Sequence, residues 1–224
     1  MEALALARLT PGSRKGTVTG PAGAMEVFVD VPQTCFGIAV LGHPQPLLGG
    51  SAQHKIPHVL ARGLQEAGWV AVRPNFRGVG GSAGAHDDGR GEADDTAWLV
   101  AQVSAVHPAL PLALVGFSFG AYVMAQVADR LSRERAPAAA VVLVGAPVGT
   151  VEAGRHYDPP PLAANTLVVH GERDEQVRLQ PVLDWCGAQN HAVMVVPGAD
   201  HFFSGRLPLL RSLVVSHLKG AGAG

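Results

Sequence analysis

The feature that most constrains the fold of this chain is a regular alternation of two kinds of segment. Short apolar runs, most of them ending in glycine or proline, lie at EVFVDV (26–31), FGIAVLG (36–42), WVAVRP (69–74), PLALVG (111–116), AAVVLVG (139–145), TLVVHG (166–171) and HAVMVVPG (191–198). Between them, apolar residues recur with helical spacing at 56–68, 92–107, 121–135, 177–189 and 207–220. Valine-rich runs that are apolar on both faces are typical of strands covered by helices on both sides. The alternation therefore predicts an α/β fold with a mostly parallel sheet, where ligands bind beyond the carboxyl ends of the strands.

Length and composition indicate one domain spanning residues 1–224. A chain of this length buries about 70% of its unfolded surface in a single core. Hydrophobic residues make up 47% of the chain and charged residues only 16%, whereas about a quarter of an average soluble chain is charged. This balance indicates a large buried sheet rather than disorder.

Charge and cysteine usage exclude several classes of partner and cofactor. The formal net charge is −1, and no block of lysine or arginine is present to neutralise phosphates, so we expect no nucleic-acid partner. Cys35 and Cys186 are far apart and have no second cysteine or histidine at ligand spacing. We therefore expect no disulfide framework, no metal and no other cofactor, and a small molecule as the partner.

The termini and the apolar runs carry no signal for a membrane or for secretion. The longest nearly uncharged apolar stretch, residues 136–149, is too short to span a bilayer and contains two prolines and two glycines. The N-terminus has an acid at Glu2 and only a brief apolar patch, which is not typical of a signal peptide. These features predict a cytoplasmic protein.

Two serines lie in G-x-S-x-G patterns, Ser82 in GGSAG and Ser118 in GFSFG. A nucleophilic serine in this pattern needs a strand that passes through a sharp turn directly into a helix, because that geometry lifts the hydroxyl above the sheet. PLALVG leads into Ser118 and AYVMAQVADRL follows it, whereas a polar loop follows Ser82. Ser118 is therefore the expected nucleophile, with a structural turn serine as the alternative.

A serine hydroxyl needs a base to take its proton and an acid to orient that base. In strand–helix hydrolases these residues follow in the order serine, acid, histidine. Asp174 follows the run TLVVHG, and His201 follows the run HAVMVVPG. Both positions lie after the carboxyl ends of predicted strands, at the same rim as Ser118. Asp174 is the expected orienting acid and His201 the expected base.

Other residues compete for these roles. Glu172, Glu175 and Asp200 are near enough in sequence to serve as the acid, although a carboxylate after a strand is more often a cap or a loop charge. Asp200 directly precedes His201, so its side chain cannot readily turn back to the ring. His43, His170 and His191 lie at strand boundaries, where a hydrogen-bonded structural histidine is the more common case.

The motifs GFSFG, HGERDEQV and GADHFF together resemble the α/β-hydrolase superfamily, in particular its small cap-less bacterial serine hydrolases related to the dienelactone-hydrolase branch. HPQPLLGG (43–50) and NFRGVGGS (75–82) resemble two loops of that group. The resemblance covers residues 36–204 and implies an eight-stranded sheet, a Ser-Asp-His triad and ester-type chemistry. Members of that group often carry a second histidine where this chain has Gln45, so the role of a histidine side chain does not carry over to that position, whereas a backbone role does.

Two amides are expected to form the oxyanion hole. Phe119, after the nucleophile, offers one N–H, and the second should come from the loop after the run FGIAVLG. Pro44 and Pro46 have no N–H, so we expect the amide of Gln45, with Leu47 or Leu48 as alternatives.

The substrate is expected to be small. Only the residues between Gly145 and Thr166 are available for a cap, and DPPP (158–161) is a poor helix former, so no substantial cap is predicted. The candidate apolar wall of the cleft, each member of which is also compatible with core packing, consists of Leu47, Leu48, Phe117, Phe119 and Phe202. We expect hydrolysis of carboxylic esters of short acyl groups through an acyl-serine intermediate. A thioesterase would use the same residues, and a non-catalytic binding module is the alternative outside enzymes.

Overall fold

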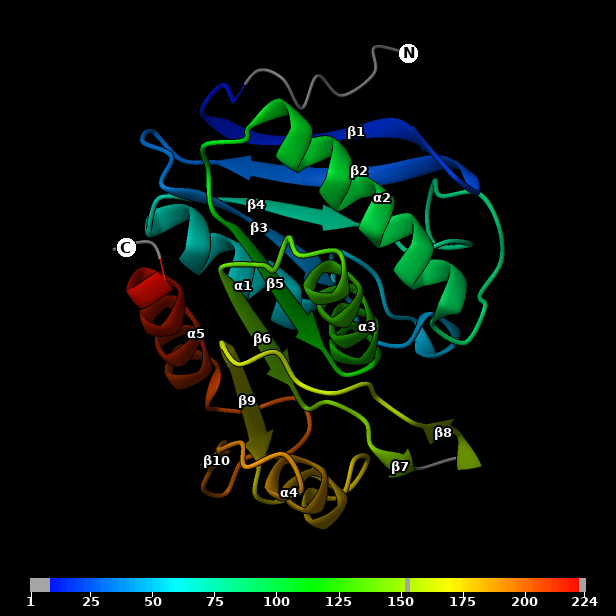
Figure 1. Ribbon diagram of the computed structural model, residues 1–224, viewed down its shortest axis with the longest axis vertical. Helices are drawn as coiled ribbons and strands as arrows, with labels where there is room; N and C mark the ends of the chain where they lie inside the picture. Colours follow the sequence, from blue (N-terminus) through cyan, green and yellow to red (C-terminus); the bar gives the residue numbers. More distant parts are fainter. Residues whose placement is uncertain (1–8, 152–153, 222–224) are drawn as a thin grey trace.

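The computed structural model describes residues 9–151 and 154–221. In that part of the chain eight strands form one sheet, in the order β1 (Gly12–Gly20), β2 (Gly23–Val31), β4 (Trp69–Pro74), β3 (Gly37–Gly42), β5 (Leu112–Phe117), β6 (Ala140–Val144), β9 (Thr166–Gly171) and β10 (Val193–Val196) (Figure 1). The pairs β1–β2 and β2–β4 are antiparallel, and every other neighbouring pair is parallel. The predicted mostly parallel eight-stranded sheet is confirmed.

Helices cover both faces of the sheet because both faces are apolar. In β5, Leu114 joins the core under α2 (Arg90–Val106) and α3 (Phe119–Arg133), which lie in front of the sheet in Figure 1. Its neighbours Ala113 and Val115 join the opposite core, under α1 (Lys55–Glu66) and α5 (Leu207–Ala221). This alternation follows from the two-residue period of a strand.

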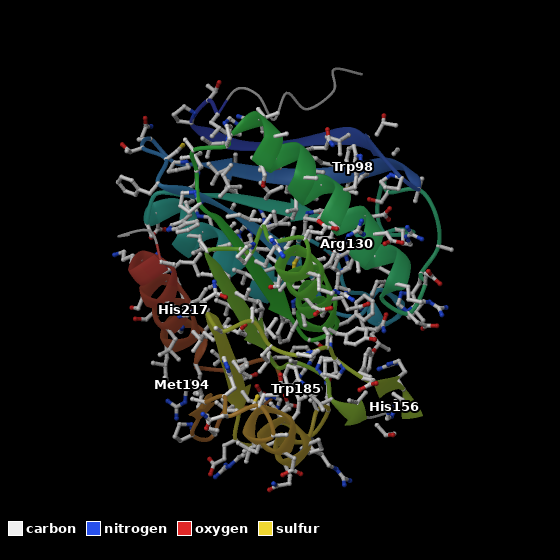
Figure 2. All side chains as sticks on the ribbon, viewed as in Figure 1. Trp98, Arg130, His156, Trp185, Met194 and His217 are labelled. Atoms are coloured by element: carbon white, nitrogen blue, oxygen red, sulfur yellow. The ribbon has the colours of Figure 1, made fainter. Side chains whose placement is uncertain are left out.

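A further helix, α4 (Leu179–Gly187), packs over β9 near one edge of the sheet. Trp98 from α2 and Trp185 from α4 are labelled in Figure 2 toward opposite ends of the sheet, and both pack against its apolar residues. None of the helices in the described ranges has both the length and the apolar character that a bilayer span requires. The expectation about a leader segment falls in part on residues 1–8, outside the described residues.

Two features were not predicted from the sequence. β1 pairs with β2 along its whole length although its residues, GSRKGTVTG, are mostly polar and half-exposed, so they carry no apolar run. The segment after β6 forms a small antiparallel hairpin of β7 (Gly149–Thr150) and β8 (His156–Tyr157), which lies away from the main sheet in Figure 1. In the described residues this hairpin takes the place in the chain where a cap would be inserted.

Helix α3 passes very close to the strands beneath it, and glycine makes this approach possible. A Cβ added at Gly120 would lie 2.3 Å from the carbonyl oxygen of Gly42 in β3. A Cβ added at Gly116 would lie 2.4 Å from the Cα of Ala121. Both separations are far below van der Waals contact, and the neighbouring atoms belong to the backbone. These two glycines therefore set how closely α3 packs against the sheet.

We predict that Gly120→Ala destabilises the protein by about 1–3 kcal/mol or more, because overpacking forces backbone elements apart. Gly187→Ala, at the last residue of α4, is the matched control, since a Cβ there meets no atom within 4 Å. Urea unfolding of both variants measures the difference. Equal stability of the two variants would contradict this account of the α3 packing.

Candidate active site

Ser118 lies in the turn between β5 and α3 and has a backbone conformation that serine rarely adopts. Its φ is 55° and its ψ is −125°. A positive φ in a residue with a side chain is strained and persists only where the surrounding structure enforces it. Here the amide of Ser118 donates to the carbonyl oxygen of Val144 at 2.8 Å, and the two flanking glycines hold the strand and helix together. The serine is thereby held at the carboxyl end of β5.

Ser82, the other serine in a G-x-S-x-G pattern, has a different environment. Its hydroxyl donates to the carbonyl oxygen of Asn75 at 2.8 Å and accepts the amide of Glu26 at 3.0 Å. The hydroxyl is therefore used in holding the loop after β4 against β2.

A continuous chain of hydrogen bonds connects Ser118, His201 and Asp174. The Nε2 of His201 lies 3.0 Å from the Oγ of Ser118, and its Nδ1 lies 2.6 Å from the Oδ2 of Asp174. Both His201 and Asp174 are buried. Because a carboxylate only accepts hydrogen bonds, the proton of a neutral ring lies on Nδ1, and Nε2 is free to accept the serine proton.

Asp174 is fixed by backbone amides as well as by the imidazole. Its Oδ1 accepts the amides of Gln176 at 3.0 Å and Val177 at 2.8 Å. The Nε2 of His170 lies 3.4 Å from the Oδ2 of Asp174 and donates to the carbonyl oxygen of Val177 at 2.9 Å. Burial lowers the pKa of His170, which favours a neutral ring beside the carboxylate.

The competing carboxylates make other contacts. Glu172 accepts the amide of Gly198 at 2.7 Å, and Asp200 accepts the amide of Ser204 at 2.8 Å. Glu175 is exposed. In the part of the chain that the structure describes, Asp174 is the carboxylate that His201 contacts.

Buried His43 joins the two loops on the other side of Ser118. Its Nδ1 donates to the carbonyl oxygen of Pro44 at 2.7 Å, and its Nε2 accepts the amide of Phe76 at 3.0 Å. Burial lowers the pKa of His43 to about 4, so the ring is neutral at physiological pH. A neutral imidazole can donate from one nitrogen and accept at the other, which both contacts require.

Gln45 follows in the same loop and is almost fully buried. Its side-chain amide donates to the hydroxyl of Tyr157 at 3.1 Å, and its Oε1 accepts the amide of Leu47 at 3.3 Å. The next three residues, Pro46–Leu48, form a short 3₁₀ helix. Phe119 is the first residue of α3, where an amide has no partner within the helix. Gln45 and Phe119 both border the cavity described next.

A cavity of about 270 Å³ opens at Ser118 and His201. Gln45, Phe119 and Leu48 form part of its wall. Two wider surface hollows, of about 670 and 730 Å³, contain neither Ser118 nor His201. The small cavity is therefore the space in which a molecule would meet the serine hydroxyl.

The remaining wall comes from residues that the sequence analysis missed. They are Pro147, Val151, Arg155 and Tyr157 from the segment around the β7–β8 hairpin, and Gln176 and Val177 from the loop after Asp174. The hairpin strands are two residues long and carry no periodic signal. No motif marked these residues, and only the path of the chain brings them to the cavity.

Three residues expected on the apolar wall do not line this cavity. Phe117 is 1% exposed and belongs to the core under α1 and α5, with its ring centroid 5.1 Å from that of His201. The expectation for Phe117 is corrected because the strand alternation directs its side chain into this core. Leu47 and Phe202 are exposed, at 67% and 43%. Phe202 packs edge-on against His201 with centroids 5.3 Å apart.

The described residues contain no group of three or more histidine, cysteine, aspartate or glutamate side chains placed to hold a metal ion.

The neutral His43 predicts a specific dependence of stability on pH. The unfolded ring has the ordinary pKa of 6.5, and the folded ring has a pKa of about 4, so only the unfolded chain takes up this proton between those values. Its contribution to stability is full above pH 6.5 and decreases by about 3 kcal/mol as the pH falls to 4. Urea unfolding between pH 7 and pH 4.5 should therefore show a shallower loss in His43→Gln than in the wild type.

His156→Gln is the control, because His156 is an exposed histidine in the hairpin. It should keep the wild-type pH dependence of the free energy of unfolding. The same pH dependence in His43→Gln and the wild type would contradict the burial of a neutral ring at position 43.

Sequence comparisons place this chain among known proteins. A family model described as the alpha/beta hydrolase fold matches residues 47–163. The uncharacterized protein RP471 of Rickettsia prowazekii is 30% identical over 193 residues, which cover 82% of this chain and 79% of that protein.

Solved structures with the same fold include two related serine hydrolases. XC6422 of Xanthomonas campestris, described as an α/β serine hydrolase without a lid, is 35% identical with a TM-score of 0.82 over 95% of this chain and 96% of that one. An α/β serine hydrolase homologue from Coxiella burnetii is 33% identical with a TM-score of 0.79 over 93% and 99%. Est1E of Butyrivibrio proteoclasticus, at 16% identity and a TM-score of 0.76 over 93% and 100%, shares the fold. The chain therefore belongs to the α/β-hydrolase family, which supports a hydrolase activity for it.

Proposed function

We propose that this protein is a serine hydrolase that cleaves carboxylic esters of small or short acyl groups through an acyl-serine intermediate. The observation that carries the proposal is the hydrogen-bond chain from Ser118 through His201 to Asp174, with distances of 3.0 and 2.6 Å. The serine-hydrolase descriptions of the Xanthomonas and Coxiella relatives support it. The esterase Pf2001 of Pyrococcus furiosus shares the fold.

In the first half of the reaction, Ser118 Oγ attacks the carbonyl carbon of the ester while His201 Nε2 takes the hydroxyl proton. The carbonyl oxygen becomes an oxyanion. When this tetrahedral intermediate collapses, the bond from carbon to the alcohol oxygen breaks, and the imidazolium returns its proton to the departing alcohol. The acyl group remains on Ser118. Asp174 orients the ring and stabilises its positive charge.

In the second half, water attacks the acyl carbon and gives a proton to His201 Nε2. The bond from carbon to Ser118 Oγ then breaks, and the proton passes from the imidazolium back to the serine. The products are one carboxylic acid and one alcohol, and the protein is regenerated. No redox step or external group is required.

The amides of Phe119 and Gln45 are the proposed donors to the oxyanion in both halves. Phe119 is the first residue of α3, so the partial positive charge of the helix N-terminus strengthens a hydrogen bond from its amide to the oxyanion. The amide of Gln45 is held by a loop with proline on both sides and by the contact of the side chain with Tyr157. Preorganised donors of this kind stabilise charge that develops only during the reaction.

The size of the cavity supports a small substrate. Its volume of about 270 Å³ lies at the lower limit of the roughly 300–1,000 Å³ that is typical of ligand pockets. The hairpin residues Val151 and Tyr157 bound it on one side. A short acyl group fits this space better than a long aliphatic chain.

Substitution of the three polar residues tests the proposed chemistry. Ser118→Ala and His201→Ala should each lower kcat for a p-nitrophenyl ester of a short acid by roughly 10⁶-fold, and Asp174→Asn by about 10⁴-fold. A fluorophosphonate probe should label Ser118 in the wild type, as mapped by mass spectrometry of the digested protein. Ser82→Ala is the control and should keep both the label and the turnover. Turnover in Ser118→Ala within tenfold of the wild type would refute the proposal.

A second pair of variants separates the backbone of Gln45 from its side chain. Gln45→Pro removes the N–H at a φ of −51°, which proline accepts. It should lower kcat by about 10²–10³-fold, the usual cost of one oxyanion donor. Gln45→Ala loses the contact with Tyr157 but keeps the N–H, so most of the activity should remain. Similar losses in the two variants would exclude the amide of Gln45 as a donor.

A further inference from the structure

Arg155 is a cationic side chain on the wall of the cavity that contains Ser118, and the proposed ester chemistry does not use it. It lies directly before β8, and its carbonyl oxygen accepts the amide of Val151 across the hairpin at 2.9 Å. Successive residues of an extended strand point in opposite directions. Arg155 and Tyr157 thus face the cavity, whereas His156 between them is exposed and is seen at the outer end of the hairpin in Figure 2.

The guanidinium of Arg155 has an unsatisfied donor. Its Nε is buried and has no hydrogen-bond partner in residues 9–151 and 154–221, and it forms no ion pair with a residue in those ranges. Arg73 also has a buried Nε without a partner, but its Nη2 is paired with Asp30 at 2.8 Å, and Arg77 is paired with Asp95 at 2.8 Å. What distinguishes Arg155 from these two arginines is that no carboxylate of the described residues is paired with its guanidinium. A buried donor without a partner is unfavourable, and an incoming acceptor would remove that cost.

The charge of the cavity wall is also unbalanced. Among the described residues that line it, Arg155 is the one permanent cation, and none is an aspartate or a glutamate. His201 is hydrogen-bonded to Ser118 and to Asp174, and Asp174 does not line the cavity. Among the described residues of the cavity wall, no carboxylate therefore compensates the positive charge of Arg155.

We propose that Arg155 binds a carboxylate of the substrate, so that the preferred substrates are short esters that carry a free carboxylate near the ester bond. This inference rests on the proposed ester hydrolysis and adds the class of substrate. The planar fork of an arginine matches the two oxygens of a carboxylate. One cation balances a carboxylate, whereas a phosphate monoester carries nearly two negative charges.

Matched esters test the inference directly. The charged substrates are monoethyl glutarate, with the carboxylate on the acyl side, and 4-acetoxybutanoate, with it on the alcohol side. The neutral partners, ethyl pentanoate and butyl acetate, have a methyl group in place of the carboxylate. In at least one pair the wild type should show a higher kcat/KM for the charged ester. Arg155→Gln should lower the ratio of charged to neutral kcat/KM by tenfold or more.

Two further variants show whether that change is specific. Arg155→Lys keeps the charge but loses the fork, so its ratio should lie between those of the wild type and Arg155→Gln. Arg62→Gln removes an exposed arginine from α1, on the other face of the sheet, and should keep the wild-type ratio. Raising the salt concentration should lower the wild-type preference, because ions screen the attraction.

The outcomes separate this inference from the proposed function. Turnover of both neutral esters with no preference for a charged partner, and the same ratio in Arg155→Gln, would overturn the role of Arg155 and leave ester hydrolysis in place. If none of the four esters is hydrolysed, a binding measurement tests the role of Arg155 instead. Glutarate should slow fluorophosphonate labelling of Ser118 more in the wild type than in Arg155→Gln, and inorganic phosphate should slow it less than glutarate. Equal protection by glutarate in both proteins would overturn the inference.

Discussion

The contact between α3 and the strands beneath it is the constraint on which the candidate site depends. With hydrogen in place of a side chain at Gly116 and Gly120, the helix begins directly at the end of β5 and lies against β3. The turn between strand and helix then has no room for an ordinary conformation, and Ser118 adopts a φ of 55°. The strain at this one residue is compensated by the packing of the sheet around it. The same turn brings the hydroxyl within hydrogen-bond distance of His201 and places Phe119 on the wall of the cavity.

The other parts of the site are held by buried polar contacts rather than by apolar packing alone. Two backbone amides and an imidazole hold Asp174. The neutral ring of His43 joins the loop that contains Gln45 to the loop after β4. Buried polar groups whose hydrogen bonds are satisfied make a structure rigid, and rigid donors are what charge stabilisation requires. Asp174 and the loop that contains Gln45 are thus held in place before any molecule enters the cavity.

The fold, and the polar side chains at the carboxyl edge of the sheet, could be predicted from the sequence for a physical reason. Parallel strands end at the same edge of a sheet, so Ser118, Asp174 and His201 could be recognised as neighbours from their positions after apolar runs. The apolar run before Ser118 and the helical pattern after it distinguished Ser118 from Ser82. Asp174 was preferred over nearby acids that stayed open as alternatives, and the structure brings Asp174 to His201.

The parts of the structure that the sequence did not predict carry no regular spacing of apolar residues. β1 is a polar edge strand, and the hairpin that brings Arg155 and Tyr157 to the cavity has strands of only two residues. Phe117 was expected at the cavity because it adjoins the serine, but its place in β5 directs the ring into the core. Contacts that depend on the path of a short loop are set by tertiary packing, and local patterns do not reveal them.

The most direct test of this account is to trap the acyl group on the protein. The wild type is mixed with the p-nitrophenyl ester of a short acid, whose activated leaving group makes deacylation the slower step, and acid stops the reaction within the first turnover. Mass spectrometry then locates the added mass. The account predicts an acyl adduct on Ser118 that disappears at the rate of turnover. Turnover without an adduct at any time, or an adduct on another residue, would contradict it.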